Sequence, residues 1–475
     1  MTRQIELLAP AGTFEALTHA CAFGADAVYA GMPRYSLRVR NNDFRNVERL
    51  KAGIDHMHNH GKKFFLALNV MPHGNKVKSF LNDLAPIVEC KPDALIMADP
   101  GLILMVRETW PDVQIHLSVQ ANTMNSASVK FWQRQGISRV ILSRELSLKE
   151  VAEIRQDCPD MELEVFVHGA LCIAYSGRCL LSGYFNHRDA NQGTCTNACR
   201  WQYGLTDTKE TPEGEVVPHF ADMDTLYSRD STTLIKPSAS SGGGCSSCGP
   251  KSEEADYTPH PDAEKSYLLQ EMKLRQGEWM EISEDENGTY IMNSRDLRAI
   301  QHVQKLVEIG IDSLKIEGRT KSAYYVARTS QLYRQAIDDA VAGREFSPEL
   351  YGKLEGLANR GYTDGFLQRH VPDAYQNYLS ASSVHYRQQF VAQVLEYDAA
   401  TGLSRLDVRN HFASGDRIEV ISPNGNRDMV LGEMKTTRGE TIPVAKGSGY
   451  VVLADIGPTT PMTMVARYLE TPIAT

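Results

Sequence analysis

The 475-residue sequence has little that would place it in a membrane or direct it out of the cell. It contains no apolar run of about 18 residues, the length that crosses a bilayer as a helix. Its first residues, MTRQIELLAPAG, lack the charged segment followed by an apolar segment that a signal peptide requires. We therefore expect a cytoplasmic protein that does not associate with membranes.

The sequence also lacks an excess of positive charge. Its 50 Lys and Arg residues are outnumbered by 59 Asp and Glu residues, which gives a net charge of -9. The chain as a whole would not attract nucleic acid, so any contact with RNA requires a local basic patch. No G-x-G-x-x-G follows the first strand-like run, which excludes the simplest dinucleotide-binding fold.

Four of the nine cysteines lie within 28 residues of a Gly-rich, polar stretch, with the spacing C-x6-C-x15-C-x3-C. They are Cys172, Cys179, Cys195 and Cys199. Zinc modules usually pair their thiolates at short spacings, as only the last two cysteines do, whereas four dispersed thiolates suit an iron–sulfur cluster equally well or better. The spacing favours an iron–sulfur site and leaves zinc or metal-free thiols as alternatives.

Other cysteines and histidines give weaker signals. Cys21, Cys90 and Cys158 occur singly in helical contexts, where a cysteine usually serves as a small buried hydrophobic residue. His56 and His60 in DHMHNHGKK would share a helix face, but no acidic base lies among the histidines of this segment. We interpret it as a solvated helix end.

Eight short β-branched or apolar runs alternate with stretches of helical periodicity. They cover residues 4–9, 25–31, 63–70, 93–99, 114–120, 139–145, 163–169 and 312–318. Such alternation predicts a parallel sheet wrapped by helices, and eight units favour a (β/α)8 TIM-like barrel over an open sheet.

The spacing of these runs also predicts the domain organisation. The barrel would span 1–330 and carry a long insertion after strand 7, at about 170–290, because a helix-like stretch at 294–311 directly precedes the eighth strand. The helical stretches in residues 331–385 predict a helical connector. Residues 386–475 show alternating apolar and polar runs with turn signals, which predict a small C-terminal β-barrel domain.

Active sites of such barrels are built at the carboxyl ends of the strands, where the four cysteines also begin the insertion. Polar residues that follow the predicted strands are therefore candidates, although any single one could instead satisfy loop backbone. They are Asn69, Ser118, Gln120, Asn122, Ser143, Arg144, Glu145, His168, Glu317 and Arg319.

Several of these motifs resemble a known family. The runs ELLAPAG, GADAVYAG, SVQAN, EVFVHGALC, SGRC and SLKIEGR resemble, over nearly the whole chain, the U32 family, long labelled collagenase-like peptidases. The longer runs PRYSLRVRNNDF, VILSRELSL, SGRCLLSGYFNHRDANQGTCTNACRW and IMNSRDLRAI are similar to the tRNA-hydroxylation branch of that family.

The resemblance implies prephenate-dependent synthesis of 5-hydroxyuridine at the wobble position of tRNA, with the anticodon loop as substrate. It also implies a 4Fe-4S cluster on the four cysteines, supplied by the iron–sulfur assembly machinery. Some relatives take a ligand from a cysteine in the helix that precedes the SLKIEGR strand. That helix carries Arg298 here, so Cys199 is the natural candidate for the fourth ligand.

We assign roles to the remaining candidates on this basis. The catalytic candidates are Arg144, Glu145, His168, Glu317 and Arg319. Those for binding substrate, including bidentate Arg contacts with phosphate or carboxylate, are Arg38, Asn69, Gln120, Asn122, Arg178 and Arg188.

Two other functions stay open. A U32-type peptidase is one, although the sequence has neither H-E-x-x-H nor G-x-S-x-G, and a thiol protease pairing one cysteine with His168 would leave three cysteines unexplained. A zinc-stabilised RNA-binding accessory protein is the other.

Overall fold

The computed structural model describes residues 5–32, 34–36, 42–70, 72, 74–170, 296–357, 362–368, 388–447 and 449–469, and the backbone of short strands between 174 and 291. By its internal contacts the chain divides into two compact units. One comprises Met1–Leu171 and Arg295–Thr475, and the other comprises Cys172–Ser294. The chain therefore leaves the first unit directly before the first of the four clustered cysteines.

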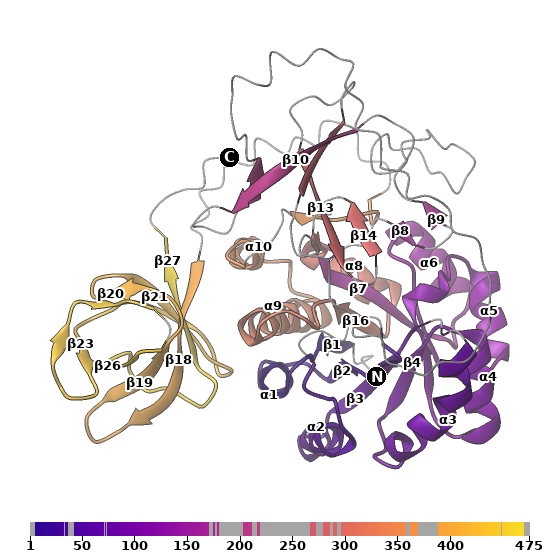
Figure 1. The fold of residues 1–475 in the computed structure, drawn as a ribbon, viewed down its shortest axis with the longest axis horizontal. Helices are drawn as coiled ribbons and strands as arrows, with labels where there is room; N and C mark the ends of the chain where they lie inside the picture. Colours follow the sequence, from indigo (N-terminus) through magenta and orange to yellow (C-terminus); the bar gives the residue numbers. More distant parts are fainter. Residues whose placement is uncertain are drawn as a thin grey trace, which may run out of the picture. The chain divides into compact units, whose positions relative to one another are not determined.

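Eight parallel strands form a closed barrel in the first unit (Figure 1). They are β1 (Glu6–Pro10), β2 (Ala27–Gly31), β3 (Lys63–Leu68), β4 (Ala94–Met97), β5 (Ile115–Leu117), β6 (Arg139–Ile141), β7 (Glu162–Ala170) and β16 (Ser313–Ile316). Neighbours pair in chain order, and β16 closes the ring because it pairs with both β7 and β1. Every strand coincides with a predicted run, so the prediction of a (β/α)8 barrel is confirmed.

Helices surround the strands on the outside of the barrel (Figure 1). They are α1 (Phe14–Ala22), α2 (Val47–Asn59), α3 (Gly74–Val88), α4 (Pro100–Thr109), α5 (Ser126–Arg134), α6 (Leu148–Asp157), α8 (Val303–Ile309), α9 (Ala323–Val341) and α10 (Pro348–Glu355). Local sequence fixes where several begin: Ser147 and Glu150 form a reciprocal capping box at the start of α6. Among the described residues, no helix is long and apolar enough to cross a membrane.

The stretch 294–311, predicted as one helix, begins instead as a strand. β15 (Asp296–Arg298) pairs antiparallel with the end of β7, and α8 begins only at Val303. The cause is the length of β7, which extends beyond its pairing with β16 and leaves backbone groups that need partners. β15 supplies these partners, and β17 (Tyr362–Thr363) extends the same edge.

The barrel interior contains a network of charged side chains. Arg139 of β6 is almost fully buried and contacts Glu6 of β1 and Glu164 of β7, with 3.1 Å from its Nη1 to Oε2 of Glu164. Burial alone would lower the pKa of Arg139, but the carboxylates of Glu6 and Glu164 outweigh it and raise the pKa. Lys315 of β16 completes the network, with its Nζ 2.9 Å from Oε1 of Glu164.

A separate antiparallel sheet with its own apolar core follows the helices. Its strands are β18 (Gln388–Asp398), β19 (Leu403–Val408), β21 (Arg417–Ile421), β22 (Arg427–Val430), β23 (Met434–Thr436), β24 (Thr441–Ile442), β26 (Val451–Ala454) and β27 (Met464–Tyr468), in the order β22-β21-β27-β18-β19-β26-β23-β24. Buried residues such as Leu406, Phe412 and Val465 fill the core. The predicted C-terminal β domain is therefore present as a half-barrel.

The second unit contains its own antiparallel sheet. Its strands are β10 (Tyr203–Glu210), β11 (Val216–Pro218), β12 (Tyr267–Glu271), β13 (Trp279–Asp285) and β14 (Gly288–Ile291), in the order β11-β10-β12-β13-β14. Two short strands, β8 (Ala174–Tyr175) and β9 (Arg178–Cys179), pair with each other.

Candidate active site at the barrel mouth

Two predicted catalytic residues, Arg144 and Glu317, form an ion pair at the carboxyl ends of the barrel strands. Arg144 follows β6 and Glu317 follows β16, and their Nη2 and Oε2 atoms are 3.2 Å apart. The Arg144 guanidinium also lies over the ring of Phe166 on β7, 3.8 Å from its centroid. A guanidinium has five N–H donors, and this ion pair uses one. Arg144 is therefore held in place and retains capacity to bind a carboxylate or phosphate.

Beneath the ion pair, Lys315 lies between two aromatic rings. Nζ of Lys315 is 4.3 Å from the ring centroid of Tyr29 and 5.3 Å from that of Phe166. Burial lowers the pKa of Lys315, although its contact with Glu164 opposes this effect. The positive charge at the mouth thus continues into the barrel, between aromatic faces that attract cations.

Arg319, the third predicted catalytic residue at the mouth, is held by residues at the end of β2. Its Nη1 donates to Oγ of Ser36, and its guanidinium is 5.7 Å from the Tyr29 ring centroid. Gly31 makes room for this contact, because a Cβ there would lie 2.5 Å from Nη1 of Arg319 and 2.6 Å from Oγ of Ser36. Only a glycine fits without displacing the guanidinium.

His168 lies on the other side of the barrel wall. In β7 and β16, Phe166 is opposite Lys315 and His168 is opposite Ile316, so a bulge at Val167 adds one residue to β7. Paired residues project from the same face of a sheet, so the bulge turns His168 to the outer face, away from Glu164 and Phe166.

The outer environment of His168 is aromatic and closed to solvent. The rings of Tyr325, Tyr333 and Tyr362 surround it, with centroids 5.4–5.7 Å away. Tyr333 donates its hydroxyl proton to the carbonyl of Val167 at 2.7 Å, so it accepts from Nδ1–H of His168 at 3.3 Å. Burial, followed by the charges of Arg298 and Lys321, lowers the pKa of His168 to about 3. His168 is therefore a neutral imidazole that supports the wall.

The other predicted residues within the described part of the chain lie at the same end of the barrel as Arg144. Gln120 is in the 3-10 helix Val119–Ala121 after β5, and the left-handed Asn122 (φ 50°) ends that helix. Ser143 donates to the carboxylate of Glu145 after β6, and the half-buried Asn69 follows β3. The structure thus places these residues at the carboxyl ends of neighbouring barrel strands without assigning their roles.

The remaining site predictions fall outside the residues whose side chains the structure describes. They are Arg38, Arg178 and Arg188, and the four ligand candidates Cys172, Cys179, Cys195 and Cys199.

Sequence reasoning did not single out Tyr29, Phe166, Lys315, Ser36 or Gly31. The first three resembled ordinary strand residues, because their inward orientation depends on strand pairing. The available signal was the glycine that ends the GADAVYAG run, since glycine at a strand end marks close approach by another group.

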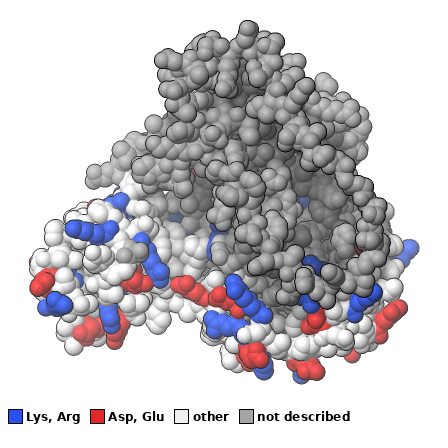
Figure 2. Space-filling view, in the orientation of Figure 1, with Lys and Arg blue, Asp and Glu red and all other residues white. Residues whose placement is uncertain are grey.

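Charges of both signs occur on the described surface that Figure 2 shows. On the face shown in Figure 2, Lys and Arg side chains are interspersed with Asp and Glu over the described surface. This pattern agrees with the net charge of -9.

Comparison with known proteins places the chain in a family. The model of peptidase family U32 matches residues 12–377, and that of the U32 C-terminal domain matches residues 386–466. The chain belongs to peptidase family U32. The family indicated by the sequence motifs is thereby confirmed.

Curated relatives cover almost the full chain. It is 53% identical to tRNA hydroxylation protein P of Escherichia coli (strain K12), over 94% of this chain and 92% of that protein. It is 50% identical to tRNA hydroxylation protein P of Haemophilus influenzae, over 96% of this chain and 94% of that protein. A more distant relative is the 23S rRNA 5-hydroxycytidine C2501 synthase of E. coli, which is 27% identical over 78% of this chain and 46% of that protein.

Proposed function

We propose that this chain is a tRNA-hydroxylating enzyme. The observation that carries the proposal is the 53% identity with tRNA hydroxylation protein P, which extends over 94% of the chain. The name of the rRNA 5-hydroxycytidine synthase adds support, because it describes hydroxylation of a pyrimidine in another RNA by a protein that is 27% identical to this chain.

The target we propose is the wobble uridine, with 5-hydroxyuridine as product. This base is unpaired in the anticodon loop, so an enzyme captures it without opening a duplex. Guanidinium groups pair with phosphate oxygens and stack on bases, and Arg144 and Arg319 supply two of them at the mouth.

The same guanidinium groups support prephenate as a co-substrate. Prephenate carries two carboxylates, and Arg binds a carboxylate through paired N–H donors. Arg144 keeps donors beyond those used by Glu317, so one carboxylate would bind there. In this arrangement Glu317 orients Arg144.

We also propose a 4Fe-4S cluster on Cys172, Cys179, Cys195 and Cys199. The support is the chemistry of the donor set, because four thiolates are the usual ligands of such a cluster. When bound, the cluster would supply electron transfer. Its assembly would make the iron–sulfur machinery a partner of this chain.

The test is nucleoside analysis of tRNA from a strain that lacks the native gene. We expect 5-hydroxyuridine and its derivatives to be absent, to return with the wild-type gene, and to stay at one tenth of the wild-type level or less with Arg144→Met. The matched control is Arg344→Met, because Arg344 forms an exposed ion pair with Asp339. Unchanged nucleosides in the deletion strain would overturn the proposal.

The two alternative functions have their own tests. A peptidase would cleave peptides in a purified assay, and Arg144→Met would not alter tRNA nucleosides. A zinc-stabilised accessory protein would be colourless, free of iron and replete with zinc after anaerobic purification.

A further inference from the structure

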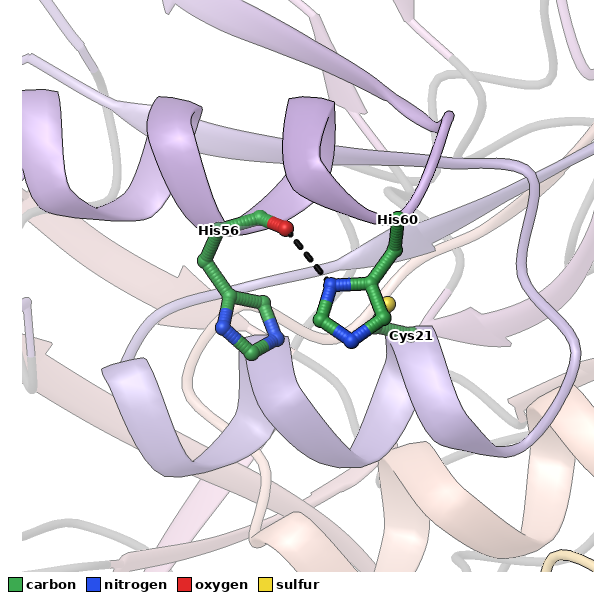
Figure 3. Close-up of side chains that lie close together, drawn as sticks. All are labelled: Cys21, His56 and His60. Atoms are coloured by element: carbon green, nitrogen blue, oxygen red, sulfur yellow. Dashed lines mark hydrogen bonds between the residues drawn. The ribbon is translucent and has the colours of Figure 1, made fainter.

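Three side chains of the types that bind metals meet on the outside of the barrel, between α1 and α2. Cys21 is near the end of α1, His56 is in the last turn of α2, and His60 is its C-cap residue. One ligand atom of each lies within 4.8 Å of those of the other two. Figure 3 shows both imidazoles projecting from α2, with the Cys21 sulfur beside the His60 ring.

The hydrogen bonding of His60 leaves its other ring nitrogen available as a ligand. Nδ1 of His60 lies 2.8 Å from the backbone oxygen of His56. A carbonyl oxygen only accepts, so Nδ1 carries the proton, and in the neutral ring Nε2 has a lone pair. Metal-binding histidines usually show this arrangement, in which a backbone carbonyl fixes the orientation of the ring.

The surrounding structure holds the three residues together. His56 and His60 are four positions apart, and their ring centroids are 4.6 Å apart. Nζ of Lys62 donates to the backbone oxygens of Cys21 at 2.6 Å and Ala25 at 2.7 Å, which fixes the end of α1 against the loop after α2. The carboxyl end of α2 also favours a cation, because the last carbonyl groups of a helix carry partial negative charge.

We propose that Cys21, His56 and His60 form a binding site for a divalent transition-metal ion of the zinc class, with the fourth ligand position open to solvent. One thiolate and two imidazoles are a donor set that zinc accepts in tetrahedral geometry. Ligand atoms around tetrahedral zinc are about 3.3–3.6 Å apart, so the side chains need to close by about 1 Å. The Cys21 thiol releases its proton to solvent as the metal binds.

The location separates this site from the proposed tRNA chemistry. Cys21 precedes β2 and His60 precedes β3, so the ion would lie at the amino ends of the strands, opposite the mouth that contains Arg144. The ion would connect α1 with α2, and binding to the native state alone would stabilise the fold. The inference therefore does not depend on the proposed function.

Cobalt titration of the full-length protein tests the site, because Co²⁺ replaces Zn²⁺ and its thiolate complexes absorb strongly. The variants are His60→Gln, His56→Gln and Cys21→Ser. The matched control is His58→Gln, because His58 is also in α2 but contacts Asp93, the residue before β4. We expect wild type and the control to bind one more equivalent of Co²⁺ than each variant. The difference spectrum should contain the thiolate absorption, and Zn²⁺ should abolish it.

Comparison between variants removes the contribution of the other cysteines, which are present in every sample. Equal cobalt stoichiometry and equal spectra for wild type and His60→Gln would overturn the proposal. His60 is exposed, so its replacement leaves the metal-free fold intact, and circular dichroism together with the metal-free melting temperature verifies this. The comparison of wild type with His60→Gln therefore tests the proposed metal site even if Cys21→Ser, a substitution at a buried residue, destabilises the chain.

Discussion

Arg328 of α9 and Glu419 of β21 form a doubly hydrogen-bonded ion pair that is almost completely buried. Nη1 lies 3.0 Å from Oε1, and Nη2 lies 2.7 Å from Oε2. The same carboxylate accepts from Gln388 at 2.7 Å and Asn426 at 2.9 Å. The pair therefore joins the last long barrel helix to the C-terminal half-barrel, and both oxygens of the buried Glu419 carboxylate accept hydrogen bonds.

Removing one member of this pair should destabilise the protein strongly. Arg328→Met leaves the carboxylate of Glu419 buried without its cation, at a cost of about 3–5 kcal/mol. Denaturant unfolding of the variant measures this loss. The double variant Arg328→Met/Glu419→Leu should recover much of it, because no charge stays buried. A single variant as stable as wild type would show that the two elements do not depend on the pair.

Gly31→Ala tests whether the position of Arg319 matters for activity. The new Cβ would lie 2.5 Å from Nη1 of Arg319, so the guanidinium must move. We expect about 1–3 kcal/mol of destabilisation and a fall of tenfold or more in tRNA hydroxylation, because small displacements of positioning groups reduce rates strongly. The matched control is Gly74→Ala, where a Cβ meets nothing within 4 Å. Wild-type activity in Gly31→Ala would show that the position of Arg319 does not affect tRNA hydroxylation.

The barrel could be predicted from sequence because each strand is a short β-branched or apolar run with a helix-forming stretch after it. The orientation of particular side chains could not be predicted from sequence. The bulge at Val167 that turns His168 outward exists only through the pairing of β7 with β16. Cys21 and His60 are 39 positions apart in the sequence, and only the packing of α1 against α2 brings them together.

His168 should make the protein sensitive to acid. Its pKa is about 3 in the folded state and about 6.5 in an unfolded chain. The unfolded state takes up a proton below about pH 6.5 and the folded state does not, so stability is complete above that pH and is lost as the pH falls toward 3. By pH 5 the loss from this residue is about 2 kcal/mol.

Unfolding free energies at pH 7 and pH 5 measure this effect. His168→Phe keeps an aromatic ring among the three tyrosines and cannot be protonated, so it should lose less stability over this interval than wild type. His411→Gln, at an exposed histidine, should keep the wild-type dependence. Parallel pH dependences for wild type and His168→Phe would show that another group controls acid unfolding.

The proposed cluster makes a prediction about Cys199. If all four thiolates bind, every iron is saturated, and the cluster transfers electrons without binding substrate directly. We expect four ligands, because Cys195 and Cys199 are one turn apart if TNACRW begins a helix and so present both thiolates to one side. Cys199→Ser should then lose iron and tRNA hydroxylation as severely as Cys172→Ser. Iron content after anaerobic purification and tRNA nucleoside analysis measure both losses.

Cys245→Ser is the matched control, because Cys245 lies in the Gly- and Ser-rich run SSGGGCSSCGP, which we assign no ligand role. It should keep nearly all of the iron and the activity. If Cys199→Ser instead retains a full complement of iron and normal tRNA modification, the fourth ligand lies elsewhere. Cys245 and Cys248 would then be the first residues to test, since a C-x-x-C pair offers two thiolates at the spacing that metal sites use most often.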